Sequence, residues 1–180
     1  MKVVAIVGMT GAGKTEAARV FSGSGFTSIR FGDVTDEELT KRNLELNEEN
    51  ERRVRELLRR ERGMAAYAEL NLPRIDKALA DGDVAIDGLY SWEEYVLLKG
   101  HYRDDFHVVA VCASPRTRHK RLAGRPERPL TPDEAADRDR AEIENLNKGG
   151  PIAAADYTIV NESSLEALEK AVKGIIKALK

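Results

Sequence analysis

The chain has 180 residues, enough for one domain with a sizeable core, and its 42% hydrophobic and 33% charged residues favour a globular protein over a disordered one. The net charge of −2 gives no general basic surface for nucleic acid or anionic membrane, although a local basic patch is compatible with it. The single cysteine, Cys112, excludes an intrachain disulfide, and no apolar stretch is long enough to span a bilayer. We therefore expect a cytoplasmic protein that binds neither nucleic acid nor membrane.

One motif dominates the start of the chain. Residues 2–7 form an apolar run typical of a buried strand, and residues 14–22 are expected to form a helix. The pattern G-x-x-x-x-G-K-[ST] joins them and consists of Gly8, Met9, Thr10, Gly11, Ala12, Gly13, Lys14 and Thr15. In such a P-loop, backbone N–H groups and the helix N-terminus bind phosphate oxygens, the lysine reaches the β- and γ-phosphates, and the hydroxyl binds Mg²⁺. We therefore expect residues 8–15 to bind a nucleotide; the alternative is a chance match on a glycine-rich turn.

Further apolar runs predict the rest of a sheet. After a weaker candidate strand at residues 27–31, strands are expected at residues 84–86, 106–112 and 157–160. The runs are continuous rather than alternating, which is typical of strands covered on both faces. Helical stretches separate the runs, so the pattern favours a parallel sheet with right-handed crossovers.

The segments between the strands predict helices. Residues 35–80 are expected to be mostly helical and highly charged, with a bend or interruption at Pro73. A capping box begins a helix at Thr131, which we expect to run to about residue 148 and to end at Gly149-Gly150. Apolar residues on one face predict a last helix at residues 163–179.

Two aspartates follow predicted strands, at the sheet edge where ligands of parallel sheets bind. Asp87 comes directly after Ile86 and is followed by Gly88. We interpret Asp87 as a residue that holds Mg²⁺ directly or through water; the alternative is an ordinary Asp-Gly turn. Asp33 follows the weaker strand. It is a candidate to accept the proton of an attacking hydroxyl, and a helix cap is the equally weighted alternative.

A dense group of arginines between residues 116 and 140 is typical of a lid that closes over phosphates. Arg121 and Arg125 are four residues apart and share a helix face. The group continues with Arg128, Arg138 and Arg140. Inward guanidinium groups neutralise the charge of phosphoryl transfer and exclude water. The alternative is surface pairing with the neighbouring Asp and Glu residues, Asp139 among them, which we favour for Arg116 and Arg118.

These parts together resemble the P-loop kinases of small metabolites, in particular the dephospho-CoA kinase and nucleoside monophosphate kinase group. The resemblance covers nearly the whole chain. It rests on residues 8–15, Phe31-Gly32-Asp33-Val34, Ile86-Asp87-Gly88, Arg121-Leu122-Ala123-Gly124-Arg125 and Ala155-Asp156-Tyr157-Thr158-Ile159-Val160-Asn161.

The resemblance implies one domain, residues 1–180, with the three-layer α/β fold of P-loop NTPases: a five-stranded parallel sheet with helices on both faces. Residues 33–80 would form a helical acceptor-binding insert, and residues 116–140 a short lid.

The resemblance also implies roles for single residues. Asp33 would orient or deprotonate the acceptor, and Lys14 would act on the transferred phosphate. Arg125 would reach the phosphates, Arg121 would lie over the adenine, and the loop at Asn161 would border the base.

The acceptor side departs from this group in two places. Relatives often carry arginine just after the Asp-Gly of the third strand, where this chain has Tyr90. The stretch Thr35-Asp36-Glu37-Glu38 is acidic where an acceptor phosphate favours a cation, and Arg42 or Arg74 is a candidate substitute. The acceptor is therefore less determined than the donor and need not be an ordinary nucleoside monophosphate.

Three functions are compatible with these residues. The favoured one is ATP- and Mg²⁺-dependent phosphoryl transfer to a hydroxyl or phosphate of a small molecule, such as dephospho-CoA or a nucleoside monophosphate, by a monomer or small homo-oligomer. The second is a regulatory nucleotide-binding NTPase or switch without a metabolite acceptor; the guanine motif Asn-Lys-x-Asp has only the imperfect match Asn147-Lys148-Gly149-Gly150. The third is a binding module with a vestigial site, disfavoured by the intact Lys14, Thr15, Asp33 and Asp87.

Overall fold

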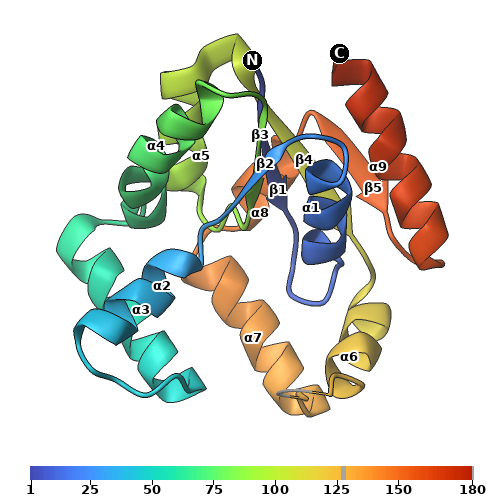
Figure 1. Ribbon diagram of the computed structural model, residues 1–180. Coiled ribbons are helices and arrows are strands. Elements are labelled where there is room, and N and C mark those ends of the chain that lie inside the picture. The colour runs from blue at the N-terminus through green and yellow to red at the C-terminus, as the bar shows by residue number, and fades with distance from the viewer. Residues whose placement is uncertain (127–128, 180) are drawn as a thin grey trace.

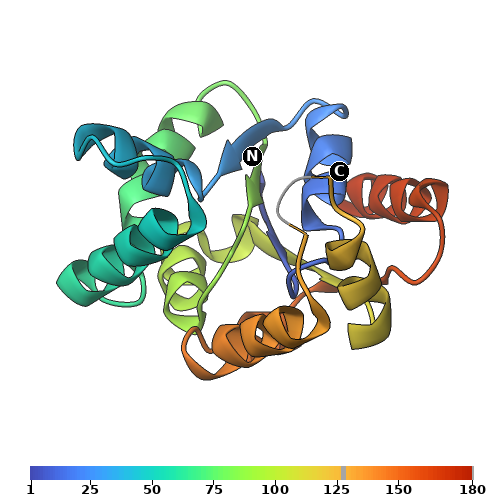
Figure 2. The ribbon, with the colours of Figure 1, turned by 90° about the horizontal axis from the view of Figure 1, so that it is seen from below.

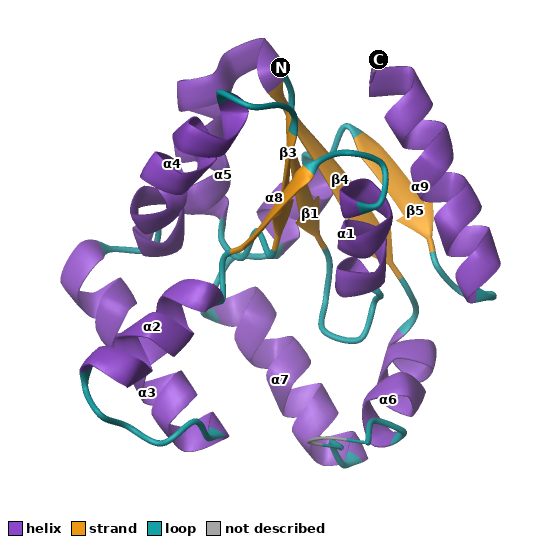
Figure 3. Cartoon of the chain, viewed as in Figure 1, coloured by secondary structure: helices purple, strands orange, loops and turns teal. Residues whose placement is uncertain are grey.

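The computed structural model, which describes residues 1–126 and 129–179, has one sheet of five parallel strands. The strands are β1 (Val3–Val7), β2 (Thr27–Arg30), β3 (Val84–Asp87), β4 (Phe106–Cys112) and β5 (Tyr157–Val160). Their order in the sheet is β2-β3-β1-β4-β5, and Figure 3 shows the sheet in orange among the helices. The predicted parallel sheet is confirmed, with the phosphate-binding motif at the end of its central strand.

Helices cover both faces of the sheet, as the view along the strands in Figure 2 shows. On one face pack α1 (Lys14–Ser22) and α9 (Leu165–Leu179), and on the other α4 (Ala66–Leu79) and α5 (Trp92–Tyr102). Every residue of β1 is fully buried, and its side chains alternate between the two cores. The three-layer α/β fold expected from the sequence is thus confirmed.

The two edge strands are less covered than the middle of the sheet. Most of β2 is exposed, and Val160 in β5 is 73% exposed. The expectation of strands covered on both faces therefore holds for β1, β3 and β4 but is wrong for β2 and β5. An edge strand has a neighbour on one side only, so helices need not extend over it.

The remaining helices lie around the carboxyl-terminal edge of the sheet (Figure 1). They are α2 (Asp33–Lys41), α3 (Glu48–Arg62), α6 (Pro115–Ala123), α7 (Pro132–Glu144) and α8 (Gly149–Ala153). Helix α7 lies between the α2–α3 pair and α6 (Figures 1 and 2), and the short helix α8 packs against α5. A single 3₁₀ turn, η1 (Arg103–Asp105), precedes β4.

Helix ends differ from the prediction at two places. Helix α7 ends at Glu144, and Gly149 begins α8 instead of ending the previous helix. The break falls at Asn147, whose φ of 51° is left-handed, a conformation that asparagine tolerates. Helix α4 runs through Pro73 without interruption, because tertiary packing of buried residues such as Ile75 holds it in place. Among the described residues, no helix has the length and apolar character needed to cross a membrane.

Candidate functional site

The P-loop turns between β1 and α1 in a conformation that its glycines make accessible. Gly13 has a φ of 106°, and a Cβ there would lie 2.5 Å from Nδ2 of Asn161. A Cβ on Gly8 would lie 2.2 Å from the carbonyl oxygen of Val111. The Nδ2 group of Asn161 donates a hydrogen bond to the carbonyl of Ala12 at 2.8 Å. The loop is therefore held from the β5 side, with the N-terminus of α1 directly behind it, as an anion cradle requires.

Lys14 lies half-buried in the loop, and its amino group has no ion-pair partner among the described residues. Its Nζ donates to the carbonyl of Met9 at 3.1 Å. Burial, followed by repulsion from Lys148, lowers the pKa of Lys14 to about 7, whereas Glu142 and Asp87 act in the opposite direction. A phosphate bound beside this group would favour its charged form, so the site is arranged to receive an anion.

Thr15 and Asp87 meet beside the loop. Thr15 lies close enough to the Asp87 carboxylate, at the end of β3, to act on the pKa of that carboxyl. Burial raises the pKa of Asp87, while Lys14, Thr15 and Arg30 counteract that rise. These two oxygen ligands fit the preference of Mg²⁺, which usually takes one or two protein ligands together with phosphates and water. The described residues contain no cluster of three or more His, Cys, Asp or Glu side chains that would hold a metal by itself.

Asp33 lies at the same edge of the sheet. It is close enough to Asp87 to raise the pKa of that carboxyl, and its own carboxylate pairs with Nη1 of Arg30 at 2.8 Å. Asp33 is the first residue of α2, whose N-cap is Gly32 without a side-chain cap. The alternative of a helix-capping role for Asp33 is therefore wrong, and its half-exposed carboxylate remains accessible to a ligand.

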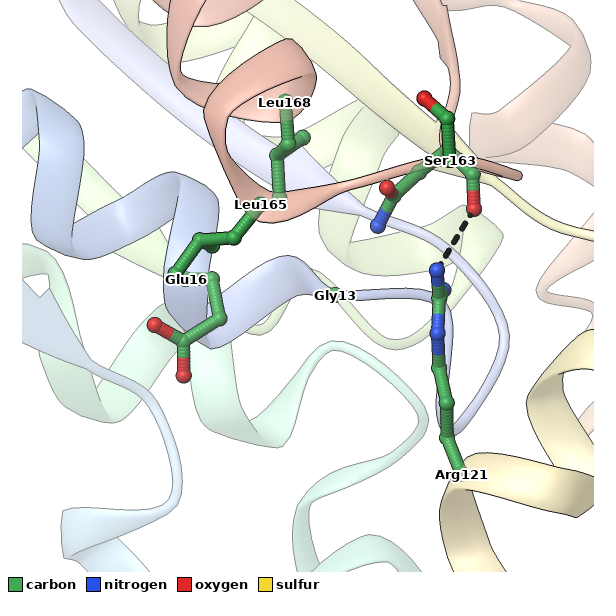
Figure 4. A pocket seen from close by; sticks show the side chains of 7 residues that line it. Gly13, Glu16, Arg121, Ser163, Leu165 and Leu168 are labelled. Carbon is green, nitrogen blue, oxygen red and sulfur yellow. Dashed lines mark hydrogen bonds between the residues drawn. The ribbon is translucent and has the colours of Figure 1, made fainter.

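Arg121 faces a pocket between the P-loop and the β5–α9 loop (Figure 4). The pocket has a volume of about 240 Å³ and is lined by Gly13, Glu16, Arg121, Asn161, Ser163, Leu165 and Leu168. Nη2 of Arg121 donates to the backbone oxygen of Asn161 at 3.0 Å, whereas Nη1 is buried without a partner among the described residues. The structure thus brings Arg121 and Asn161 together at one pocket.

The other arginines of the group lie in different surroundings. Arg125 is exposed, and partial desolvation of its guanidinium together with the charge of Arg138 lowers its pKa, so the two guanidinium groups are close. Arg128 lies outside the described residues. The surface reading of Arg118 is wrong: the residue is 4% exposed and pairs with Asp139 at 2.6 Å. Its pairing with Asp139 is confirmed.

The acceptor side holds aromatic residues. Tyr90 is partly buried and packs edge-on against the buried Tyr67 with ring centroids 5.9 Å apart. The guanidinium of Arg59 lies 5.0 Å from the Tyr67 ring centroid. The two candidate substitutes for the missing arginine, Arg42 and Arg74, are paired with acids of α2. Both line a groove of about 310 Å³ between α2, α3 and α4. The acidic stretch after Asp33 therefore already has cationic partners.

Sequence reasoning missed a buried pair next to the P-loop. Glu142 of α7 accepts hydrogen bonds from Thr10, and Nζ of Lys148 lies 2.9 Å from the Glu142 carboxylate. Nothing in the sequence distinguishes these residues, because a lysine after a helix and a glutamate within one are ordinarily solvated.

The comparisons with known proteins agree with this geometry. A family model described as an AAA domain matches residues 4–145. The UPF0200 protein TK1334 of Thermococcus kodakarensis is 38% identical over 179 residues, which cover 97% of this chain and 96% of that protein. The shikimate kinase of Bacteroides thetaiotaomicron has a TM-score of 0.63 at 16% identity, covering 99% of this chain and 98% of the other. The dephospho-CoA kinase of Campylobacter jejuni has a TM-score of 0.57 at 13% identity, covering 99% and 97%.

At such low identities the two kinase structures are evidence for the fold alone, which is that of small-molecule P-loop kinases. The family match spans most of the chain, and the Thermococcus relative spans nearly all of it. The chain therefore belongs to the AAA domain family and to the UPF0200 proteins.

Proposed function

We propose that this protein is an ATP- and Mg²⁺-dependent kinase that transfers a phosphoryl group to a hydroxyl or phosphate of a small molecule, such as dephospho-CoA or a nucleoside monophosphate. The observation that carries the proposal is the meeting of Lys14, Thr15, Asp87 and Asp33 at one sheet edge. P-loop kinase folds with this arrangement catalyse by positioning and charge stabilisation. The likeness in fold to a shikimate kinase and a dephospho-CoA kinase supports the same conclusion.

The donor half of the site would use residues 8–15 for the phosphates and Arg121 with Asn161 for the base. Lys14 and Arg125 would stabilise negative charge on the transferred group. Thr15 and Asp87 would hold Mg²⁺, which when bound supplies charge neutralisation of the phosphate oxygens. Residues 116–140 would form the lid that closes over this half and excludes water.

The acceptor half would lie across the sheet edge, with residues 33–80 as its helical insert. The Asp33 carboxylate would accept the proton of the acceptor hydroxyl. Its ion pair with Arg30 at 2.8 Å orients this carboxylate at the sheet edge. A phosphate acceptor needs no such proton transfer, so dependence on Asp33 separates hydroxyl from phosphate acceptors.

A regulatory NTPase without an acceptor is the second candidate. The pairing of Arg42 and Arg74 with acids of α2 favours it, because these arginines are then not free to bind an acceptor anion. Turnover distinguishes the two functions. A kinase forms ADP rapidly only with the right acceptor present, whereas a switch hydrolyses ATP slowly without one.

The decisive experiment is an acceptor screen with ATP and Mg²⁺, read as ADP formation, over nucleoside monophosphates, dephospho-CoA and small hydroxylated metabolites. No stimulation by any acceptor above the basal rate would favour the regulatory function.

Lys14→Ala should abolish turnover, because the phosphates lose their cation. The exposed Lys170→Ala serves as a matched control with unchanged activity. Full activity of Lys14→Ala would refute the assignment of the P-loop.

Asp33→Asn should retain ATP binding but lose transfer to a hydroxyl acceptor by about 10²–10⁴-fold. Asp104→Asn, an exposed acid before β4, is its control. Loss of ATP binding in Asp33→Asn would instead indicate a structural or metal-binding role for this carboxylate.

A further inference from the structure

One residue of the P-loop, Thr10, is held at its N–H by α7 and at its carbonyl by Arg118 of α6, which is itself paired with α7. Its backbone N–H donates to Glu142 of α7 at 3.1 Å, and its hydroxyl donates to the other oxygen of that carboxylate. Its carbonyl accepts from Nη1 of Arg118 at 3.1 Å, and that guanidinium pairs with Asp139 of α7. Asp139 and Glu142 are three residues apart and therefore share one face of α7. This face of α7 contacts the phosphate loop, directly through Glu142 and by way of Arg118 through Asp139.

The Glu142 carboxylate is a buried anion at the edge of a loop built to bind anions. The Glu142 residue is 8% exposed, and its counter-ion Lys148 is 1% exposed. Besides Lys148, the charged groups that face Glu142 are Lys14 and Arg138, whose Nε lies 3.8 Å away. Lys148 in turn faces Glu142, Lys14, Arg138, Glu94 and the ring of Tyr90, whose centroid is 5.5 Å from its Nζ.

These contacts have two opposing consequences for a triphosphate. A carboxylate that accepts the Thr10 N–H and hydroxyl fixes the conformation of the loop, which favours binding by preorganisation. The same negative charge repels the phosphates unless a cation neutralises it. Lys148 is the described cation nearest to this carboxylate, so the benefit of Glu142 depends on Lys148.

We propose that Glu142 is a positioning residue of the donor-phosphate site, which holds Thr10 in place for the triphosphate and requires Lys148 as its counter-ion. The proposal rests on the proposed function, because it concerns how the P-loop binds ATP. It assigns the α7–α8 junction a role in binding the donor in addition to its role in the fold.

The test compares single and double variants by direct binding of a non-hydrolysable ATP analogue with Mg²⁺. Lys148→Met removes the nearest counter-ion of Glu142 and leaves only Arg138 and Lys14 to offset its charge, so more of that negative charge acts on the phosphates and affinity should fall at least about tenfold. Glu142→Gln keeps an oxygen for the Thr10 N–H and removes the negative charge, so affinity should stay within about threefold of the unmodified protein. The double variant should recover most of the affinity lost in Lys148→Met. Exposed Lys170→Met and Glu144→Gln are matched controls.

A pH series provides a readout that a merely structural pair would not move. Lys148 is the largest of the influences that hold the pKa of Glu142 down against the effect of its burial, so without Lys148 this pKa should be higher than in the unmodified protein. Lowering the pH should therefore protonate more of the Glu142 carboxylate in this variant. The affinity of Lys148→Met for the analogue should then improve relative to that of the double variant, which lacks the titrating carboxylate. Trp92, the sole tryptophan of the chain, lies against Gly150 just after Lys148, so its fluorescence reports whether α8 is intact in each variant.

Several results would overturn the proposal. Equal losses of affinity in Glu142→Gln and Lys148→Met, or no recovery in the double variant, would show that charge compensation is not the cause. If Lys148→Met fails to fold, the test rests on Glu142→Gln and the double variant. A loss of analogue affinity beyond about tenfold in both of these variants overturns the proposal. Near-normal affinity in both supports it. Failure of the unmodified protein to bind the analogue would instead refute the proposed function, and this inference with it.

Discussion

Glu94→Gln should change how the stability of the protein depends on pH. Glu94 lies in the first turn of α5, where its Oε2 accepts the N–H of Tyr90 at 2.7 Å and that of Ser91 at 3.3 Å. Its Oε1 is buried and has no hydrogen-bond partner among the described residues. Burial raises the pKa of Glu94 from 4.5 to about 7, against the opposing effects of these N–H groups and of the charges of Arg59 and Lys148.

The sign and the size follow from linkage. A carboxyl whose pKa is raised by folding binds its proton more tightly in the folded state. Its contribution to stability is therefore fully present below pH 4.5 and is lost as the pH rises through about 7. At about 1.4 kcal/mol for each pH unit between the two pKa values, the loss amounts to about 3 kcal/mol. Glutamine has nearly the same shape, keeps an oxygen for the two N–H groups and does not titrate.

The assay is urea unfolding of both proteins at intervals from pH 4 to pH 8. The free energy of unfolding of Glu94→Gln, minus that of the unmodified protein, should rise by about 3 kcal/mol across this range. Taking the difference cancels the titration of all other groups. Glu69→Gln, an exposed acid on α4, controls for the loss of one negative charge. A difference that stays flat with pH, in two cooperatively folded proteins, would refute the argument that Glu94 is buried as a neutral acid.

Two further variants test the frame of the P-loop. Gly13→Ala should destabilise the fold by about 1–3 kcal/mol and weaken ATP binding, because the φ of 106° and the nearby Asn161 Nδ2 exclude a Cβ. Thermal unfolding measures the change in stability. The control is Gly100→Ala in α5, where a Cβ meets open space, and it should be neutral or slightly stabilising. Asn161→Ala should cost about 1–3 kcal/mol in urea unfolding, since it leaves the buried carbonyl of Ala12 without its 2.8 Å partner. A melting temperature of Gly13→Ala equal to that of Gly100→Ala, or an unchanged midpoint for Asn161→Ala, would contradict this account of the loop.

The sheet and the P-loop were predictable because their signals are local. The fully buried β1 reads as an unbroken apolar run, and the helix that follows the loop begins at Lys14 as predicted. Helix ends were less predictable where tertiary packing overrides propensity. Pro73 remains inside α4, and the left-handed Asn147 ends the α7 region before the glycines expected to do so. Neither the continuation of α4 through Pro73 nor the end of the helix before Asn147 can be predicted from the residues within one helical turn of these positions.

The candidate site was predictable only where strand order alone brings residues together. Asp33 and Asp87 follow neighbouring strands, so their shared edge follows from a parallel sheet. The contact between Glu142 and Lys148 depends on how α7 packs at the carboxyl-terminal edge of the sheet. The hydrogen bond between Thr10 and Glu142 joins residues that are 132 positions apart in the sequence. The surface reading of Arg118 failed for the same reason: its partners Asp139 and Thr10 meet only in the folded chain.

The hydrogen bond from Asn161 to Ala12 joins residues 149 positions apart, and this separation has a consequence for biosynthesis. The P-loop is synthesised near the start of the chain, but its hydrogen bond with Asn161 can form only after β5 has been synthesised. Contacts between such distant segments form late, because closing a long loop costs conformational entropy. A nascent chain that ends before β5 therefore carries the whole phosphate-binding motif without the side chain that braces it. We expect the capacity to bind nucleotide to arise near the end of synthesis, as a property of the completed sheet.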